Sequence, residues 1–194
     1  MAYPARVVSA LLRLAPEQVR GLSAVQYDAL VAAGMLDGQR VELLEGVLVE
    51  VAPSSPEHSA TVRAVARALL EQLPSGWDVR EEKPLRVSPS SEPEPDIAVV
   101  RDADWSTAHP TTALVLVEVA RTSLVVDLEV KPAVYAAAGV REYWVIDLAA
   151  RVVHVHRRPT RDGYDEVVVH RAGPLRSSTE PVIVLDVADV LAPE

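Results

Sequence analysis

The chain has 194 residues, of which 49% are hydrophobic, and a formal net charge of −9. This length and apolar content predict a globular fold with a sizeable core, which aliphatic side chains must fill because phenylalanine is absent. The absence of cysteine excludes disulfides and thiolate metal sites, and the acidic balance argues against indiscriminate binding to a phosphate backbone.

The beginning of the chain predicts an arm over residues 1–22, ahead of a single domain over residues 23–194. A short helix is expected over residues 10–14, with Pro16 interrupting it. The apolar stretch there lacks an A-x-A-like cleavage site, and no apolar run reaches the ~18 residues that a membrane span requires. We therefore expect a cytoplasmic protein with no signal peptide and no membrane association.

A capping box opens the domain. Ser23 and Gln26 have the spacing with which each side chain bonds to the other residue's backbone N–H at a helix start. The helix is expected to run to about Ala33, with Gly34 directly after its end.

Residues 40–51 predict two short strands around a two-residue turn at Glu45 and Gly46. This hairpin places Glu42 opposite Val49, on a face shared with apolar side chains. A carboxylate on such a face needs a partner if it is buried. Glu42 is therefore either a buried, partnered carboxylate or a solvated residue of an edge strand.

The next helix follows a loop rich in proline and serine. Ser55 is placed to cap it and Pro56 to occupy its first turn, and apolar residues recur with a helical period to about Leu73. His58 lies one turn before the apolar face and points the same way, inward. It is either a histidine satisfied by one hydrogen bond or part of a site.

The middle of the chain predicts a βαβ crossover. Strands are expected over residues 77–87, 96–100 and 114–119, followed by a helix that ends near Gly139 and a buried strand over residues 143–147. Because a strand, a helix and a strand in this order return to one sheet, part of that sheet should be parallel.

The tail predicts a hairpin, with its turn at Asp162 and Gly163, and a last strand; these strands span residues 151–157, 165–171 and 182–185. His154 and His156 share one face of the first strand. A solvated or edge face explains them better than a metal site does.

Two acidic residues are the first candidates for chemistry. Asp96 begins a buried strand, and Glu118 lies inside the most apolar strand of the chain. A charge there costs several kcal/mol unless it is compensated, so Glu118 should be protonated, ion-paired or bound to a metal. Oxygen ligands without cysteine suit a hard cation such as Mg²⁺ or Mn²⁺.

Lys131 is the expected base or charge partner. It follows Asp127 by four residues and shares a helical face with Tyr135, so it can reach a carboxylate at the strand end. Residues before proline avoid the α region, however, which favours a helix that starts at Pro132. On the residues alone, a solvated lysine at the N-cap is thus the favoured interpretation, and an inward lysine is the alternative.

An ordered set of motifs resembles a large bacterial family described as putative restriction endonucleases, within the PD-(D/E)XK nuclease superfamily. The resemblance covers residues 23–192, and the strings that carry it are VELLEG, PEPDIAVV, LVEVARTS, D-x-x-x-K and GVREYWVID, with His58 at a helix start and Tyr135 after the lysine.

The resemblance implies roles for particular residues. Asp96 corresponds to the aspartate of the PD motif and Glu118 to the second metal carboxylate. Ala120 stands where the standard motif has its lysine, and Lys131 matches the family's lysine on the following helix. Glu42 matches an early glutamate that completes the acidic cluster.

Auxiliary roles are implied for four further residues, namely His58, Ser123, Asp127 and Tyr135. This sequence has Ala-Arg-Thr-Ser where the family has a Leu-Ser-Pro-Ser-like turn, and Thr122 or Ser123 is expected to supply a hydroxyl there.

The fold implied by the resemblance is α/β, with an αβββαβ core, a mixed central sheet flanked by helices, an N-terminal helix and β-hairpin, and a C-terminal β-hairpin. The implied function is a Mg²⁺- or Mn²⁺-dependent endonuclease that hydrolyses phosphodiester bonds, with DNA as the substrate and a homodimer as the assembly. The alternative is an inactive module of this fold that binds nucleic acid or a protein partner.

Overall fold

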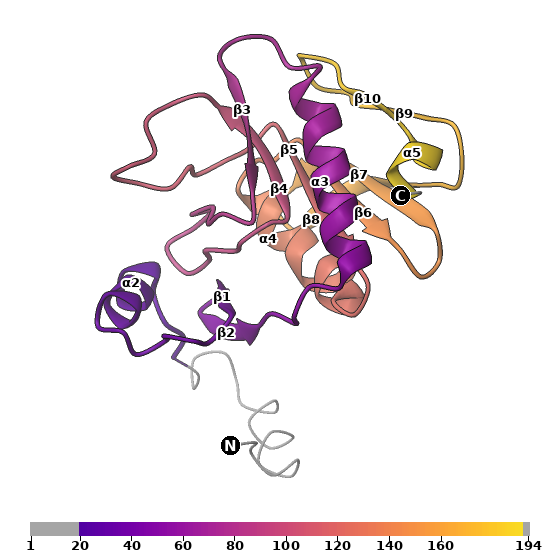
Figure 1. Ribbon diagram of the computed structural model, residues 1–194. Coiled ribbons are helices and arrows are strands. Elements are labelled where there is room, and N and C mark those ends of the chain that lie inside the picture. Colours follow the sequence, from indigo (N-terminus) through magenta and orange to yellow (C-terminus); the bar gives the residue numbers. More distant parts are fainter. Residues whose placement is uncertain (1–19, 192–194) are drawn as a thin grey trace.

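The computed structural model describes residues 20–191 and is built around one mixed six-stranded sheet (Figure 1). The strand order is β3-β4-β5-β6-β7-β8, in which β5 and β6 are parallel and all other neighbours are antiparallel. The strands span Trp77–Glu81, Ile97–Arg101, Val115–Ala120, Glu142–Asp147, Val152–Thr160 and Gly163–His170. Most of the predicted arm, including the helix expected at residues 10–14, lies outside the described residues.

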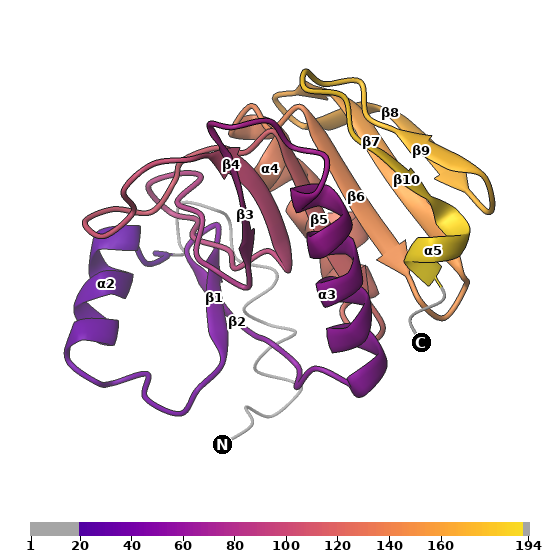
Figure 2. The same cartoon turned by 45° about the horizontal axis from the view of Figure 1, so that its top comes forward.

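Helices cover both faces of this sheet (Figures 1 and 2). Helix α3, Pro56–Leu70, packs through Val62, Val65 and Leu69 into the larger core. Helix α4, Lys131–Ala137, packs Tyr135 into the second core on the other face. This order of elements confirms the predicted αβββαβ core with a βαβ crossover from β5 to β6. No helix among the described residues is long and apolar enough to cross a membrane.

Smaller elements extend the two sides of the sheet. Helix α2, Ala24–Ala32, and the hairpin of β1, Val41–Leu44, and β2, Val47–Glu50, lie on the β3 side. On the other side, β9, Pro174–Arg176, pairs with β10, Val184–Asp186, ahead of α5, Val187–Leu191. The prediction included no strand at the position of β9.

Local sequence chemistry explains the N-terminal elements. Both bonds of the capping box between Ser23 and Gln26 form, as predicted. Glu45 and Gly46 both have positive φ, 48° and 80°, the requirement of a two-residue type I′ turn. That turn fixes the register, and Glu42 pairs with Val49 as predicted.

The segment before α4 differs from the prediction. A π-helical turn, η2, spans Val126–Val130, and Lys131 is the first residue of α4, with its backbone in the α region. The N–H of Lys131 donates to the carbonyl of Val126. Because Pro132 has no N–H and its ring collides with a carbonyl of a regular α-turn, the wider π turn accommodates it. Lys131 is buried, so the favoured interpretation of a solvated N-cap lysine is wrong.

Three further predictions need correction. Strand β3 ends at Glu81 rather than near residue 87, because Glu82 has a φ of 48° and leaves the extended conformation. The tail hairpin turns one residue earlier than predicted, since Thr160 pairs with Gly163. His156 is not solvated: β7 lies between β6 and β8, and the imidazole is buried.

Candidate functional site

A pocket opens where β4 begins and β5 ends, between the first turn of α3, the β1–β2 hairpin and η2. Its wall contains seven of the eight predicted site residues: Glu42, His58, Asp96, Glu118, Ser123, Asp127 and Lys131. The eighth, Tyr135, reaches the same cluster from α4 through its hydroxyl. Segments far apart in the sequence therefore meet at one place.

Asp96 and Glu118 are held together by the register of two antiparallel strands. Ile97 pairs with Val117, so one step further along the ladder Asp96 lies opposite Glu118. The backbone N–H of Asp96 donates to Oε2 of Glu118 at 3.3 Å, and the N–H of Val119 donates to Oδ2 of Asp96 at 2.7 Å. Each carboxylate is thus oriented by the backbone of the other strand.

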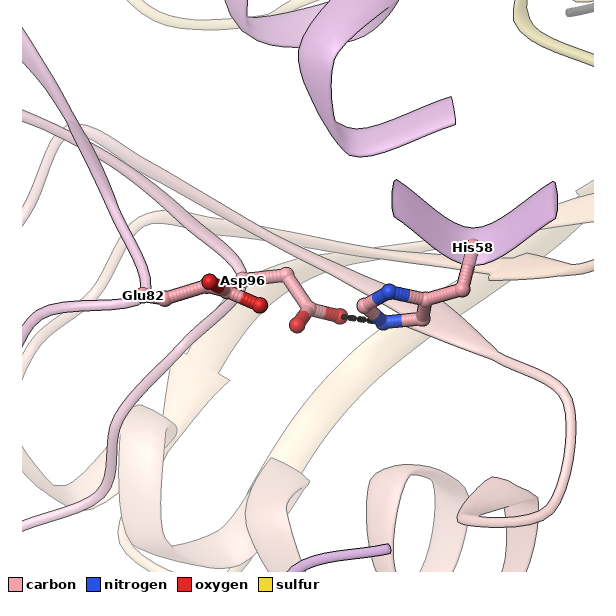
Figure 3. Close-up of side chains that lie close together, drawn as sticks. All are labelled: His58, Glu82 and Asp96. Carbon is pink, nitrogen blue, oxygen red and sulfur yellow. Dashed lines mark hydrogen bonds and ion pairs between the residues drawn. The ribbon is translucent and has the colours of Figure 1, made fainter. Parts of the chain in front are cut away.

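His58 approaches Asp96 from the first turn of α3, where Ser55 caps the helix by accepting the N–H of His58. Its Nε2 lies 3.1 Å from Oδ2 of Asp96 (Figure 3). This hydrogen bond raises the pKa of His58, because it stabilises the charged imidazolium beside a carboxylate. Among the described residues, Oδ1 of Asp96 accepts no hydrogen bond.

Glu118 is the centre of a buried charge cluster. Its Oε1 accepts hydrogen bonds from Lys131 Nζ at 2.9 Å and from the Tyr135 hydroxyl at 2.8 Å. Burial raises the pKa of Glu118 well above its ordinary value, an effect that the lysine opposes. Burial alone would lower the pKa of Lys131, but the carboxylates of Glu118, Glu42 and Asp127 outweigh it and hold that pKa above its ordinary value. Lys131 is therefore an ammonium.

Glu42 is a second carboxylate that contacts Lys131. Its Oε1 lies 3.1 Å from Lys131 Nζ, and its Oε2 accepts the backbone N–H of Glu94 at 3.1 Å. Of the two alternatives open for Glu42, the structure contains the buried, partnered carboxylate. The hairpin that carries it is attached to the loop between β3 and β4 by a bridge between Leu43 and Glu92.

Asp127, on η2, is the third carboxylate close to Lys131. Its Oδ2 accepts the Ser123 hydroxyl at 2.5 Å, and its Oδ1 lies 3.6 Å from Lys131 Nζ without a hydrogen bond. Burial raises the pKa of Asp127. The Tyr143 hydroxyl donates to the carbonyl of Asp127 and so fixes the backbone of the π turn.

Four residues of the site were not predicted. Arg40, Glu94 and Arg121 line the pocket, and Glu82 brings its carboxylate close to Asp96 and His58 (Figure 3). Glu94 stands between the two prolines beside Asp96, which was an available signal. Glu82 offered none, since its place depends on how β3 pairs with β4 across a long loop.

The donor chemistry of the pocket fits a divalent metal ion. Six carboxylates line it, and Lys131 is their one buried counter-charge among the described residues. Carboxylate oxygens with one imidazole nitrogen are ligands that Mg²⁺ and Mn²⁺ accept. Asp96 and Glu118 each retain free acceptor capacity, on Oδ1 and Oε2 respectively, and both residues line the pocket.

The chain is similar to known proteins in both sequence and fold. The family model of Uma2, described as a putative restriction endonuclease, matches residues 24–188. A solved structure of a putative nuclease belonging to DUF820, from Anabaena variabilis, is similar with a TM-score of 0.61 and 16% sequence identity, over 78% of this chain and 89% of that one. At this identity the likeness concerns the fold. No curated protein matches the chain.

Proposed function

The chain belongs to the Uma2 family, and from that membership together with the pocket we propose that it is a metal-dependent endonuclease that hydrolyses phosphodiester bonds, with DNA as the substrate. The observation that carries the proposal is the contact of Asp96, Glu118 and Lys131 in one pocket wall. Two carboxylates and a lysine on neighbouring elements are the groups that this hydrolysis needs.

Asp96 and Glu118 are the proposed metal-holding residues, with Glu42 as the third carboxylate of the cluster. A divalent cation bound there would neutralise charge on the phosphate and would lower the pKa of a nearby water. The Val119 N–H and His58 orient Asp96, while Lys131 and Tyr135 fix Oε1 of Glu118. The protein thus supplies two carboxylates whose rotamers are set before the substrate arrives.

The protonation of Lys131 decides its role. Because the surrounding carboxylates keep it charged, Nζ holds its proton at neutral pH. We therefore assign Lys131 to orienting Glu118 and stabilising negative charge, rather than to removing a proton from water. Tyr135 likewise keeps its proton, since burial raises its pKa well above the ordinary value.

The rim of the pocket carries positive charge that can bind a polyanion, whereas the interior is lined mainly by carboxylates. Arg40 and Arg121 are exposed and line the opening, and Arg121 also pairs with Glu57 at the start of α3. Guanidinium groups bind phosphate oxygens in a bidentate manner. With a net charge of −9, the chain has no general attraction for DNA, so binding relies on these local contacts.

One observation favours a second candidate function, a non-cleaving module of the same fold that binds nucleic acid or a protein. Lys131 and Tyr135 already occupy Oε1 of Glu118, and Lys131 also pairs with Glu42. A closed network of this kind gives the buried carboxylates partners without any metal ion.

Cleavage assays separate the two candidates. Supercoiled plasmid and single-stranded DNA are incubated with Mn²⁺, Mg²⁺ or EDTA, comparing the wild type with Glu118→Ala. Glu129→Ala removes an exposed carboxylate from η2 and is the matched control. We expect metal-dependent nicking by the wild type and the control, and none by Glu118→Ala. A well-folded wild type that cleaves neither substrate supports the binding module.

A further inference from the structure

His58, Glu82 and Asp96 come from three separate elements and direct their side chains at one point beside the pocket (Figure 3). One ligand atom of each residue lies within 4.8 Å of the other two. We propose that these three residues bind a divalent transition-metal ion, and that they make the protein prefer Mn²⁺ to Mg²⁺. The inference deepens the proposed function and rests on it for the reaction, because Asp96 is common to both.

The convergence follows from strand register. Glu81 pairs with Ile97, so Glu82 follows β3 at the level of Asp96, and its backbone N–H donates to the carbonyl of Asp96 at 3.1 Å. Glu118 stands at the same level on the other neighbour of β4. Three carboxylates thus form a row across β3, β4 and β5.

The two ends of this row are compensated differently. At one end, Lys131 and Tyr135 both donate to Glu118. At the other end, the Glu82 carboxylate makes no hydrogen bond or ion pair with any residue between 20 and 191. Carboxylates that face each other across neighbouring strands repel, and a bound cation turns that repulsion into attraction. A cation added near Glu82 is therefore attracted more strongly than one added near Glu118, whose charge Lys131 already compensates.

The donor set determines which cation is preferred. Mg²⁺ favours oxygen ligands and retains its waters, whereas imidazole nitrogen suits first-row transition metals. His58 supplies one such nitrogen beside the oxygens of Glu82 and Asp96, and the bound ion displaces the proton of that nitrogen into solvent. The Ser55 cap holds the first turn of α3, so the histidine is directed at Asp96 before any ion binds. We therefore assign the metal preference to His58 and the additional carboxylate to Glu82.

Metal binding can be measured without cleavage. The full chain is titrated with Mn²⁺ while electron paramagnetic resonance monitors the free ion, and Mg²⁺ is added as a competitor. The variants are Glu82→Gln and His58→Gln, with Glu81→Gln as the matched control, because Glu81 is an exposed neighbour on the opposite side of the strand. Thermal unfolding without metal verifies that each variant folds.

We expect the wild type and Glu81→Gln to bind Mn²⁺ at least about tenfold more tightly than Mg²⁺. Glu82→Gln should weaken Mn²⁺ binding by about tenfold or more, and His58→Gln should bring the Mn²⁺ and Mg²⁺ affinities close together. Wild-type Mn²⁺ affinity in Glu82→Gln, or an unchanged preference in His58→Gln, overturns the inference.

The same proteins, assayed for plasmid nicking, separate this inference from the proposed function. Mn²⁺ bound through Glu82 and His58 without any cleavage by the wild type leaves the inference standing and overturns the nuclease. Metal-dependent cleavage together with wild-type Mn²⁺ affinity in Glu82→Gln supports the nuclease and overturns the inference.

Discussion

Lys131 Nζ and Glu118 Oε1 lie 2.9 Å apart, and the two side chains are only 6% and 4% exposed. A buried pair of this kind contributes little to stability by itself, because desolvation offsets the attraction. Loss of one partner has a much larger effect, since the other charge then remains buried without compensation. In this protein the lysine compensates three carboxylates at once.

Replacement of the lysine should therefore destabilise the fold in a pH-dependent way. We expect Lys131→Met to lower the free energy of unfolding by about 3–5 kcal/mol at neutral pH. Burial already raises the pKa of Glu118 and Asp127, so these groups bind protons more readily in the folded state. The deficit should be smallest at acidic pH and grow as the pH rises.

Urea unfolding at several pH values tests this expectation. The sequence offers a close control, because Lys83 is exposed and also precedes a proline, so Lys83→Met changes the same residue type in the same local context. Equal stability of Lys131→Met and Lys83→Met at neutral pH would contradict the buried role of Lys131.

The tyrosine beside the lysine should affect activity more than stability. Tyr135→Phe keeps the ring that packs edge-on against Tyr143 and removes only the hydroxyl that donates to Glu118. Because the Tyr135 hydroxyl orients the proposed metal-holding carboxylate of Glu118, its loss should slow single-turnover nicking by about tenfold or more. Tyr164→Phe, which removes a hydroxyl outside the site, should cleave at the wild-type rate.

A buried histidine that does not line the pocket predicts a separate pH effect on stability. Burial, aided by His154, lowers the pKa of His156 from 6.5 to about 4. The unfolded chain therefore binds a proton at a higher pH than the folded chain does. Stability should be complete above about pH 6.5 and fall towards pH 4, by about 3 kcal/mol in total.

His156→Phe should remove this slope, since the phenyl ring retains the contacts with Tyr143 and Tyr164 and cannot bind a proton. Chemical denaturation of both proteins between pH 7 and pH 4 measures the difference. Parallel curves for wild type and variant would show that His156 titrates normally in the folded protein.

The two arginines at the pocket rim predict the salt dependence of DNA binding. Each phosphate contact that Arg40 or Arg121 makes releases a counterion, so Arg40→Ala should weaken binding and reduce the slope of log affinity against log salt by about 1. Fluorescence anisotropy with a labelled duplex, at several salt concentrations, measures both quantities. Arg171→Ala alters an exposed arginine after β8 and should bind as the wild type does.

We expect the predicted homodimer to form through the outer strand of the sheet. Strand β8 is an edge strand with three consecutive exposed valines, Val167, Val168 and Val169, which are 50%, 37% and 46% exposed. Because an apolar edge readily pairs with a second chain and charge prevents this, Val168→Lys should yield a monomer. Sedimentation at micromolar concentration measures the oligomeric state of both proteins. A monomeric wild type would contradict the expected homodimer.

Short-range chemistry made much of the fold predictable. The capping box at Ser23, the two-residue turn after Leu44 and the serine cap before Pro56 each depend on a few neighbouring residues, and each formed as predicted. The buried strands were identified because continuous apolar runs mark strands covered on both faces. The pairing of Glu42 with Val49 followed from the turn alone.

Long-range pairing explains what the sequence did not reveal. Glu82 reaches Asp96 only because β3 and β4 pair across the loop between them, and no local pattern specifies that register. His156 was assigned to a solvated face because alternation along one strand does not show that a later strand and two tyrosines cover it. The burial of Lys131 was uncertain because residues before proline avoid the α region, which favoured a solvated N-cap lysine. Tertiary packing overrides this local preference and buries the side chain.

The π turn at Val126–Val130 has a consequence for how this site is recognised in other sequences. A π turn includes one residue more than an α turn, and one residue corresponds to a rotation of about 100° around a helix axis. The number of residues between the strand glutamate and the helix lysine therefore does not specify the direction of the lysine. A relative without the proline could reach the same glutamate with a lysine at a different sequence distance. Relatives are therefore better compared by the direction of the lysine around the helix axis than by its distance in sequence from the glutamate.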